Sequence, residues 1–194
     1  MPFIDHFGMI APFYDRVIKT RKPDRLIGLL GLPVGGWLLD AGGGTGRIAD
    51  ILKGMALNTI VADVSLEMLR QANLKNKLTA VCTYTEKLPF LSHAFDAVVM
   101  VDAFHHVINQ PETARELFRV LRPGRRLVIE EPDIQKVSVK FVAIGEKMLL
   151  MRSHFLSPKQ IANLFAGFDA KISIERERWN AWIIVEKMGA ETRG

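Results

Sequence analysis

Leu38-Leu39-Asp40-Ala41-Gly42-Gly43-Gly44-Thr45-Gly46-Arg47-Ile48-Ala49 is the stretch of sequence that decides the fold. It predicts, in order, a buried strand, an acidic residue, a glycine turn and the start of a helix. Glycines let the backbone adopt positive φ and leave no Cβ between the chain and a ligand. Ligands of open α/β sheets bind beyond the carboxyl ends of the strands, where the winding direction reverses. The stretch therefore predicts a cofactor site, with a tight turn that binds no ligand as the simpler alternative.

The spacing of the glycines separates this loop from two other cofactor loops. In the dinucleotide fingerprint G-x-G-x-x-G, counted from Gly42, the third glycine falls on Arg47. The phosphate-binding pattern G-x-x-x-x-G-K-[ST] occurs nowhere in the chain. The loop does contain D-x-G-x-G-x-G, from Asp40 to Gly46, which resembles motif I of the class I S-adenosylmethionine-dependent methyltransferases. The resemblance implies S-adenosyl-L-methionine as cofactor and S-adenosyl-L-homocysteine as product.

Composition points to one ordinary globular domain, since 194 residues with 48% hydrophobic and 24% charged residues can bury a substantial core. The net charge is +5 and the pI about 9.5, but the basic residues are scattered, so we interpret them as a solvated surface. Cys82, the single cysteine, lies in an apolar run and is expected to be buried. Because no signal-peptide pattern and no apolar run of ~20 residues is seen, we expect a cytoplasmic protein.

Seven apolar or alternating runs are typical of β-strands, and amphipathic segments lie between most of them. Strands are expected at 36–41, 58–64, 78–83, 95–101, 126–130, 171–176 and 181–187. Helices are expected at 24–30, 45–54, 66–75, 112–121 and 157–167, the last opened by a capping box. We predict an α/β fold, a Rossmann-like doubly wound, mostly parallel seven-stranded sheet with helices on both faces and a helical lid. The closing hairpin matches the antiparallel last strand typical of the resembled family.

We predict a single domain over residues 1–194, built of four segments. An N-terminal helical lid segment spans 1–33 and a cofactor-binding core spans 34–132. A helical insertion or cap follows at 133–156, and a C-terminal helix with a hairpin at 157–194. In the first segment, Ala11-Pro12-Phe13-Tyr14-Asp15 resembles the A-x-x-Y-D stretch of quinone-type methyltransferases, where the tyrosine region closes over the cofactor. Phe13 and Tyr14 fit core aromatics equally well, and both interpretations stay open.

A second motif follows the second expected strand. Asp63 ends that strand, where an acidic side chain accepts hydrogen bonds from ribose hydroxyls in nucleotide sites. The run from Asp63 to Leu69 matches D-x-S-x-x-M-L of the resembled family, which implies that Val64 flanks the adenine. A ribose-binding acid serves nicotinamide and S-adenosylmethionine sites alike, so Asp63 does not separate the two.

Two more motifs follow in the family's order. Glu86-Lys87-Leu88-Pro89-Phe90 matches the end of D-A-E-x-L-P-F, and Phe104-His105-His106 matches F-H-H. Tyr84 stands where the family commonly has an aspartate that binds the adenine amino group. A backbone carbonyl or the Thr85 hydroxyl is expected to replace that contact, with Tyr84 packing nearby. Together the motifs resemble the small-molecule methyltransferases that include ubiquinone and menaquinone C-methyltransferases.

The resemblance implies a set of site residues. The expected cofactor-binding residues are Tyr14, Asp40, Gly42, Gly44, Asp63, Val64, Tyr84, Thr85 and Val101. Asp40 and the loop carbonyls are expected to hold the methionine ammonium, and Val101 and Asp102 to lie near the transferred methyl. In-line displacement at a sulfonium needs orientation and no nucleophilic residue, so no catalytic residue is assigned. If the acceptor must lose a proton, the candidate bases are His105, His106, His154, Tyr14 and Glu131.

Two other functions stay open. An RNA or protein methyltransferase would fit the basic pI, but the chain has no Asn-Pro-Pro-Tyr-like motif and no cysteine pair. A non-catalytic S-adenosylmethionine-binding module is suggested by Tyr84, whereas Arg47 disfavours a nicotinamide oxidoreductase. We expect a small-molecule acceptor, no nucleic-acid partner, no metal site and a monomer or homodimer.

Overall fold

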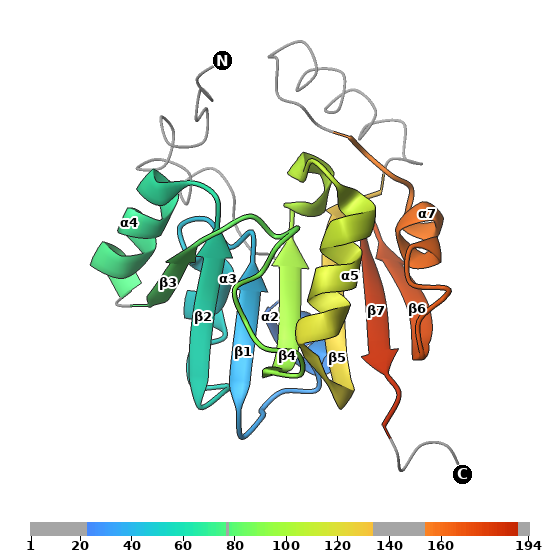
Figure 1. Ribbon diagram of the computed structural model, residues 1–194, viewed down its shortest axis with the longest axis horizontal. Helices are drawn as coiled ribbons and strands as arrows, with labels where there is room; N and C mark the ends of the chain where they lie inside the picture. The colour runs from blue at the N-terminus through green and yellow to red at the C-terminus, as the bar shows by residue number, and fades with distance from the viewer. Residues whose placement is uncertain (1–22, 77, 134–153, 190–194) are drawn as a thin grey trace.

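The computed structural model describes residues 23–76, 78–133 and 154–189, and a seven-stranded sheet forms its centre (Figure 1). The strands are β1 Trp37–Ala41, β2 Asn58–Asp63, β3 Thr79–Cys82, β4 Phe95–Val101, β5 Leu121–Pro132, β6 Ala170–Glu177 and β7 Asn180–Lys187. Their order across the sheet is β3-β2-β1-β4-β5-β7-β6. β7 is antiparallel to both β5 and β6, and the other pairings are parallel, which confirms the predicted fold class.

Helices cover both faces of this sheet (Figure 1). They are α2 Pro23–Leu30, α3 Arg47–Ile51, α4 Leu66–Asn76, α5 Gln110–Val120 and α7 Pro158–Asn163, with a short 3₁₀ turn η1 at Phe104–His106. Successive strand residues point to opposite faces. On β1, Leu39 therefore packs in the core shared with α5 and α7, while Leu38 packs in the core shared with α2 and α3. Burial on both faces explains why the central strands are apolar without alternation.

The winding direction of the chain reverses between β1 and β4. Leu39 of β1 pairs with Ile60 of β2 on one side and with Val98 of β4 on the other. The chain runs outward from β1 through β2 to β3, then returns to β4 on the opposite side of β1. At such a point the loops after the two strands diverge and leave room for a ligand. The carboxyl ends of these parallel strands lie at the top of Figure 1.

The helix ends follow their sequence signals. Ser157 and Gln160 exchange side-chain and backbone hydrogen bonds, so the predicted capping box is present at the start of α7. At the far end of α5, Lys187 Nζ of β7 donates to the carbonyls of Phe118 (2.7 Å) and Leu121 (2.9 Å). Carbonyls in the last turn of a helix lack intrahelical partners. A side chain from the last strand therefore completes the hydrogen bonding of this helix.

Element boundaries differ from the expected ones by three residues or more at three places. β5 begins at Leu121 and not at 126, because residues 122–125 form an irregularity within the strand. Arg122 donates to the carboxylate of Asp96 (2.8 Å), and Gly124 adopts a φ of 74°, so the residues between the helix and the regular strand form a bulge. α3 covers Arg47–Ile51 where 45–54 was expected, and α7 ends at Asn163 where 167 was expected.

The expectation that Cys82 is buried was wrong, since its side chain is exposed. Cys82 ends β3, a four-residue strand at the edge of the sheet that pairs with β2 alone. An edge strand with one neighbour has fewer side chains to cover it than the central strands have. The apolar run that suggested burial thus marks a strand, but not a central one.

The lid and the cap fall mostly outside the described residues. Residues 1–22, which include Tyr14, and residues 134–153 are not described, so both segments stay predictions. The described part of the 1–33 segment is α2, whose Leu26 and Leu30 pack against the sheet with Val128 and Ile184. Among the described helices none is long and apolar enough to cross a bilayer.

Candidate functional site

The glycine loop after β1 is anchored to the end of β2 by backbone hydrogen bonds. The N–H groups of Gly42 and Gly43 both donate to the Ala62 carbonyl, at 2.7 and 3.2 Å. The Gly46 N–H then donates to the Gly43 carbonyl (2.8 Å), and α3 starts at the next residue. The loop is therefore a closed turn that rests on β2.

Two neighbouring glycines of the loop have different surroundings. A Cβ added to Gly43 would lie 2.6 Å from the Asp40 carboxyl group, so the backbone packs directly against that side chain. Gly44 has a φ of 53°, and a Cβ there would meet nothing closer than 3.9 Å, where Asp63 Oδ2 lies. Gly43 is thus needed for internal packing, whereas Gly44 presents open space beside Asp63. That open face is where a ligand can approach the backbone.

Asp63 joins the glycine loop to the start of α4. Its Oδ2 accepts a hydrogen bond from the Gly44 N–H (2.9 Å) and its Oδ1 accepts one from the Ser65 N–H (2.8 Å). The two oxygens of one carboxylate thus bond to two different backbone N–H groups. The side chain fits a ribose-binding role and at the same time fixes the loop.

Asp40 lies behind the loop, with none of its surface exposed. Its Oδ2 accepts from the Ala49 N–H of α3 (3.0 Å), while Oδ1 has no hydrogen-bond partner among the described residues. Burial raises the pKa of Asp40 to about 7, although the Ala49 N–H and the Arg47 charge oppose the rise. A buried acceptor without a donor is costly, by roughly 1–3 kcal/mol. A donor supplied by a ligand, such as an ammonium group, would offset that cost.

The predicted adenine contacts follow β2 and β3. Val64 and Tyr84 are half exposed, at 50% and 49%. Thr85 is buried, and its hydroxyl lies 3.2 Å from the Thr113 hydroxyl of α5. The Thr83 N–H donates to the Asp63 carbonyl (2.9 Å), which ties the end of β3 to Asp63. Val64 and Tyr84 are therefore accessible to a planar ring, whereas the Thr85 hydroxyl is engaged inside the protein.

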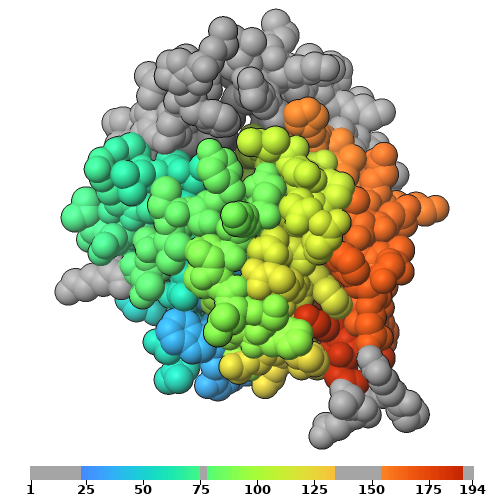
Figure 2. Space-filling model, viewed as in Figure 1, coloured from blue at the N-terminus to red at the C-terminus, as the bar shows by residue number. Residues whose placement is uncertain are grey.

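Glu86 connects the segment after β3 to the loop after β4. Its Oε1 accepts from the Ile108 N–H (2.8 Å) and the Asn109 N–H (3.1 Å), directly before α5. Further along, the Leu88 N–H donates to Glu116 of α5 (2.8 Å). These bonds give a structural reason for the Glu-x-Leu-Pro-Phe motif. Figure 2 shows this green segment covering the surface between α4 and α5.

The residue that follows β4, Asp102, has a left-handed backbone with a φ of 51°. Its N–H donates to the Glu130 carbonyl of β5 (2.9 Å). Burial raises the pKa of Asp102 to about 7, and the neighbouring carboxylates of Glu131 and Glu130 add to the rise. A protonatable carboxyl group with a pKa near neutrality therefore lies at the carboxyl end of a central strand.

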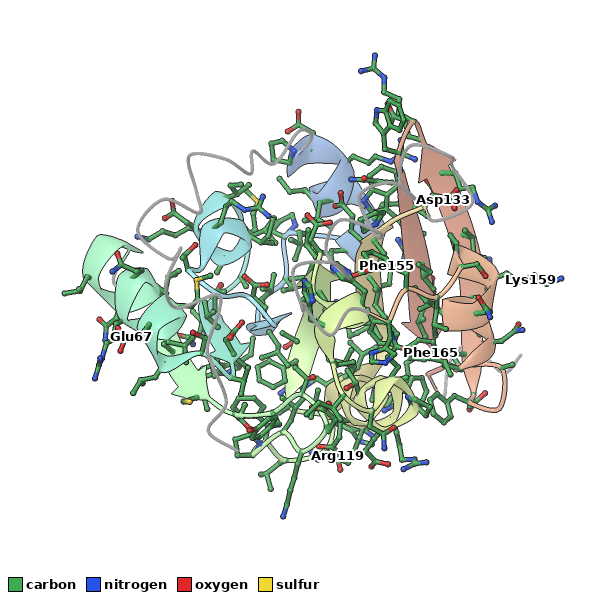
Figure 3. The ribbon with its side chains drawn as sticks, turned by 90° about the horizontal axis from the view of Figure 1, so that it is seen from above. Glu67, Arg119, Asp133, Phe155, Lys159 and Phe165 are labelled. Carbon is green, nitrogen blue, oxygen red and sulfur yellow. The ribbon has the colours of Figure 1, made fainter. Side chains whose placement is uncertain are left out.

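A buried histidine–carboxylate pair lies beside Asp102. His105 Nδ1 is 2.5 Å from Glu131 Oε2, and the other oxygen of Glu131 accepts from the Phe104 N–H (2.8 Å). The His105 ring stacks on Phe155, with ring centroids 4.2 Å apart. Figure 3, which looks down on the carboxyl ends of the parallel strands, shows Phe155 near the centre of the view. The pair joins η1, β5 and the chain that leads into α7.

The other candidate bases have different surroundings. Burial, and to a lesser degree the neighbouring His105, lowers the pKa of His106 to about 3, so its imidazole is neutral at pH 7. The side chain of His154 is exposed, and its backbone N–H donates to the His105 carbonyl (2.7 Å). Tyr14 lies outside the described residues. Of the five candidate bases, His105 and Glu131 are the two that bond to each other.

The predicted site residues that the structure describes gather at one edge of the sheet. They lie in or after the carboxyl-terminal ends of β1, β2, β3 and β4, and are Asp40, Gly42, Gly44, Asp63, Val64, Tyr84, Thr85 and Val101. Sequence reasoning missed the bridging role of Glu86 and the backbone conformation of Asp102, neither of which has a local signal. Across residues 23–76, 78–133 and 154–189, no group of three His, Cys, Asp or Glu side chains is placed to hold a metal ion.

Comparison with known proteins agrees with this arrangement. Residues 39–129 match the family model described as "Methyltransferase domain". The ubiquinone/menaquinone biosynthesis C-methyltransferase UbiE of Pseudomonas putida is 32% identical over 115 residues, which cover 54% of this chain and 45% of that protein. Demethylmenaquinone methyltransferase of Paenarthrobacter aurescens is 29% identical over 133 residues, covering 64% and 53%. The chain spans about half the length of the curated relatives it matches.

Solved structures share the fold over nearly the whole chain. A chain in the complex of the Trm112 methyltransferase activator with a methyltransferase from Haloferax volcanii superposes with a TM-score of 0.80, at 15% identity, covering 97% of this chain and 100% of that one. A SAM-dependent methyltransferase from Thermotoga maritima superposes with a TM-score of 0.74, at 20% identity, covering 93% and 98%. At such identities the likeness establishes the fold.

Proposed function

We propose that the chain is a class I S-adenosylmethionine-dependent methyltransferase domain, since residues 39–129 match the methyltransferase family model. It would transfer a methyl group from S-adenosylmethionine to a small-molecule acceptor by in-line displacement. The observation that carries the proposal is the hydrogen bond from the Gly44 N–H to the Asp63 carboxylate. The carboxylate at the end of β2 bonds to the Gly44 N–H beside open space. An acidic side chain at that place in the fold supports a ribose-binding role. The four motifs, in their order along the chain, support the same activity.

The residues present fit the cofactor. Asp63 would hold the ribose hydroxyls, Val64 and Tyr84 would flank the adenine, and the open face at Gly44 would admit the ligand next to the backbone. The partnerless Oδ1 of Asp40 suits the methionine ammonium. The rest of the proposed set, namely Tyr14, Gly42, Thr85 and Val101, stays a proposal on the resemblance alone.

S-adenosylmethionine supplies an activated methyl group on a sulfonium, so the protein has to orient the reactants and exclude water. The loops after β1 and β4 provide that rigidity, because backbone hydrogen bonds hold each of them to a neighbouring strand. The acceptor is proposed to lie beyond β4 and β5, where Asp102 and the His105–Glu131 pair are. Quinone-like rings are the first acceptors to assay, since two relatives are named for ubiquinone or menaquinone chemistry.

Isothermal titration calorimetry of the full chain with S-adenosylmethionine and S-adenosylhomocysteine tests the proposal. We expect both ligands to bind in the micromolar range typical of enzyme substrates, roughly 1 μM–1 mM. No heat of binding with either ligand at about 1 mM would overturn it. Binding without methylation of any quinol, phenol or amine acceptor would favour the non-catalytic alternative. A cytoplasmic location and a monomeric or homodimeric state stay predictions from the sequence.

A further inference from the structure

Asp102 and Asp63 lie on opposite sides of the glycine loop. Asp63 ends β2 and Asp102 follows β4, and β1 lies between these two strands in the sheet. The loop also contacts the segment after β4, because a Cβ added to Gly42 would lie 2.7 Å from the Ala103 Cβ. A ligand whose ribose is held at Asp63 and which crosses the loop therefore extends toward Asp102.

The surroundings impose the backbone conformation of Asp102. Its φ of 51° lies in the left-handed region, which costs an L-residue roughly 1–2 kcal/mol. The bond from its N–H to the Glu130 carbonyl (2.9 Å) attaches the residue to β5 in that conformation. Residues in such conformations persist only where neighbouring structure holds them, and they concentrate at ligand sites. The position of Asp102 is thus fixed before any ligand binds.

Charged groups face Asp102 from three elements. Glu130 and Glu131 lie on β5, Arg47 begins α3, and His105 lies in η1. The two glutamates raise the pKa of Asp102 and the two basic residues lower it, with burial as the largest effect. The net result is a pKa of about 7.

The neighbouring glutamates have hydrogen-bond donors of their own, whereas Asp102 does not. Glu130 accepts from the Asn180 side chain (2.6 Å), and Glu131 is bonded to His105 (2.5 Å). No hydrogen bond or ion pair engages the Asp102 carboxylate among the described residues. Its acceptor capacity is therefore available to a cationic ligand.

We propose that the Asp102 carboxylate is the counter-charge that makes the site prefer the sulfonium donor over the demethylated product. Donor and product share the adenosine and the amino-acid group, so contacts at Asp63 or the glycine loop bind both alike. They differ in one methyl group and in one positive charge on sulfur. A carboxylate near the sulfur would separate them by charge, and Asp102 lies across the glycine loop from the Asp63 carboxylate. This inference rests on the proposed function, since it assumes that S-adenosylmethionine is the ligand.

The test is calorimetry of S-adenosylmethionine and S-adenosylhomocysteine, each at pH 8.0 and pH 5.5, with the full chain. The measured quantity is the ratio of the two dissociation constants. Asp102→Asn keeps the shape and suits left-handed backbone, since Asn is enriched there. Asp102→Gly removes the side chain at a φ that glycine adopts freely and covers the case that the first variant fails to fold. Asp50→Asn, on an exposed position of α3, is the matched control for the loss of one negative charge.

We expect Asp102→Asn to lower the preference for the donor about tenfold at pH 8.0, as for a charge pair in a partly exposed site. At pH 5.5 the variant should match the wild type within about twofold, because the wild-type carboxyl group, with its pKa of about 7, is already protonated. Asp50→Asn should leave the ratio unchanged.

An unchanged ratio in both Asp102 variants at pH 8.0 would overturn the inference while leaving the proposed function intact. An equal loss of donor and product affinity would also overturn it, because that result assigns Asp102 to the shared part of the ligand. If the wild-type chain binds neither ligand, the proposed function itself fails.

Discussion

The two halves of the carboxyl edge are held together by different kinds of contact. On the β1–β2 side, backbone N–H groups of Gly42, Gly43 and Gly44 donate to fixed oxygens of β2. On the β4–β5 side, the contacts are made by ionisable side chains, above all His105 with Glu131. Backbone hydrogen bonds do not titrate, so on the β1–β2 side the group that responds near neutral pH is the buried Asp40 carboxyl behind the loop, with its pKa of about 7. On the β4–β5 side several ionisable groups lie together, among them Asp102 with a pKa of about 7. The fold thus places the proposed nucleoside site beside a region whose charge varies near neutral pH.

The largest expected effect lies on the β4–β5 side. Glu131→Ala should lower the free energy of unfolding by about 3–5 kcal/mol, because it leaves His105 and the Phe104 N–H buried without their acceptor. Urea unfolding followed by circular dichroism measures this. Glu67→Ala on the exposed surface of α4 is the control, and its change should stay below about 1 kcal/mol. An equal fall in the free energy of unfolding in the two variants would mean that the buried His105–Glu131 pair stabilises the fold no more than an exposed ion pair does.

On the β1–β2 side the largest effect should be on ligand binding. Asp63→Ala removes an acceptor of two backbone hydrogen bonds and the proposed ribose ligand, so affinity should fall about hundredfold for donor and product alike. Calorimetry with both ligands checks this, with Asp50→Asn as control. An affinity within about threefold of the wild type would remove Asp63 from the site.

The charge of Asp102 should itself cost stability. Its pKa is raised, so the folded state disfavours the ionised form, and stability falls as pH rises from about 4 to about 7. Asp102→Asn should therefore increase the free energy of unfolding at pH 8 by about 1–3 kcal/mol, since each tenfold change in proton affinity is worth about 1.4 kcal/mol.

The gain should shrink as the pH is lowered and vanish below about pH 4, where the carboxyl group is protonated in both the folded and the unfolded state. Urea unfolding between pH 4 and pH 8 follows it. A gain of equal size at every pH would show that ionisation of Asp102 is not its cause.

The smallest effect separates backbone strain from ligand contact within the glycine loop. Gly44 and Gly54 have φ values of 53° and 82°, and an added Cβ would meet no atom within 3.8 Å at either, so alanine should cost each about 1 kcal/mol of stability. Only Gly44→Ala should weaken S-adenosylmethionine binding, because its methyl group would occupy the open face beside Asp63. Thermal unfolding and calorimetry on both variants check this, and equal affinities would place the ligand elsewhere.

The comparison also explains what the sequence could predict. Glycine at close spacing and an acidic residue after a strand are informative by residue type alone, so the sequence itself predicts the Asp40–Gly46 loop and a polar role for Asp63. The capping box at Ser157 and the seven strands were predictable for the same reason, since local patterns define them.

The β4–β5 side could not be predicted in the same way. Contact between His105 and Glu131 depends on the register of β4 against β5, in which Val101 pairs with Glu130. That register brings the turn after β4, which contains His105, next to Glu131. The residue type aspartate does not by itself predict a positive φ, which Asp102 adopts in the structure. Cys82 was misassigned because the position of β3 at the sheet edge follows from strand order, which no local pattern encodes.

The place of β7 in the sheet has a consequence for how the chain is made. β7 is the last strand along the chain, yet it lies between β5 and β6, and its Lys187 completes the hydrogen bonding of α5. During synthesis the ribosome releases β5 and α5 about sixty residues before their final partner. Until then the nascent chain exposes an apolar strand edge, which is a template for pairing with other chains. The sheet can therefore close only after β7 has been made, and a chaperone that shields the edge of β5 would act in that interval.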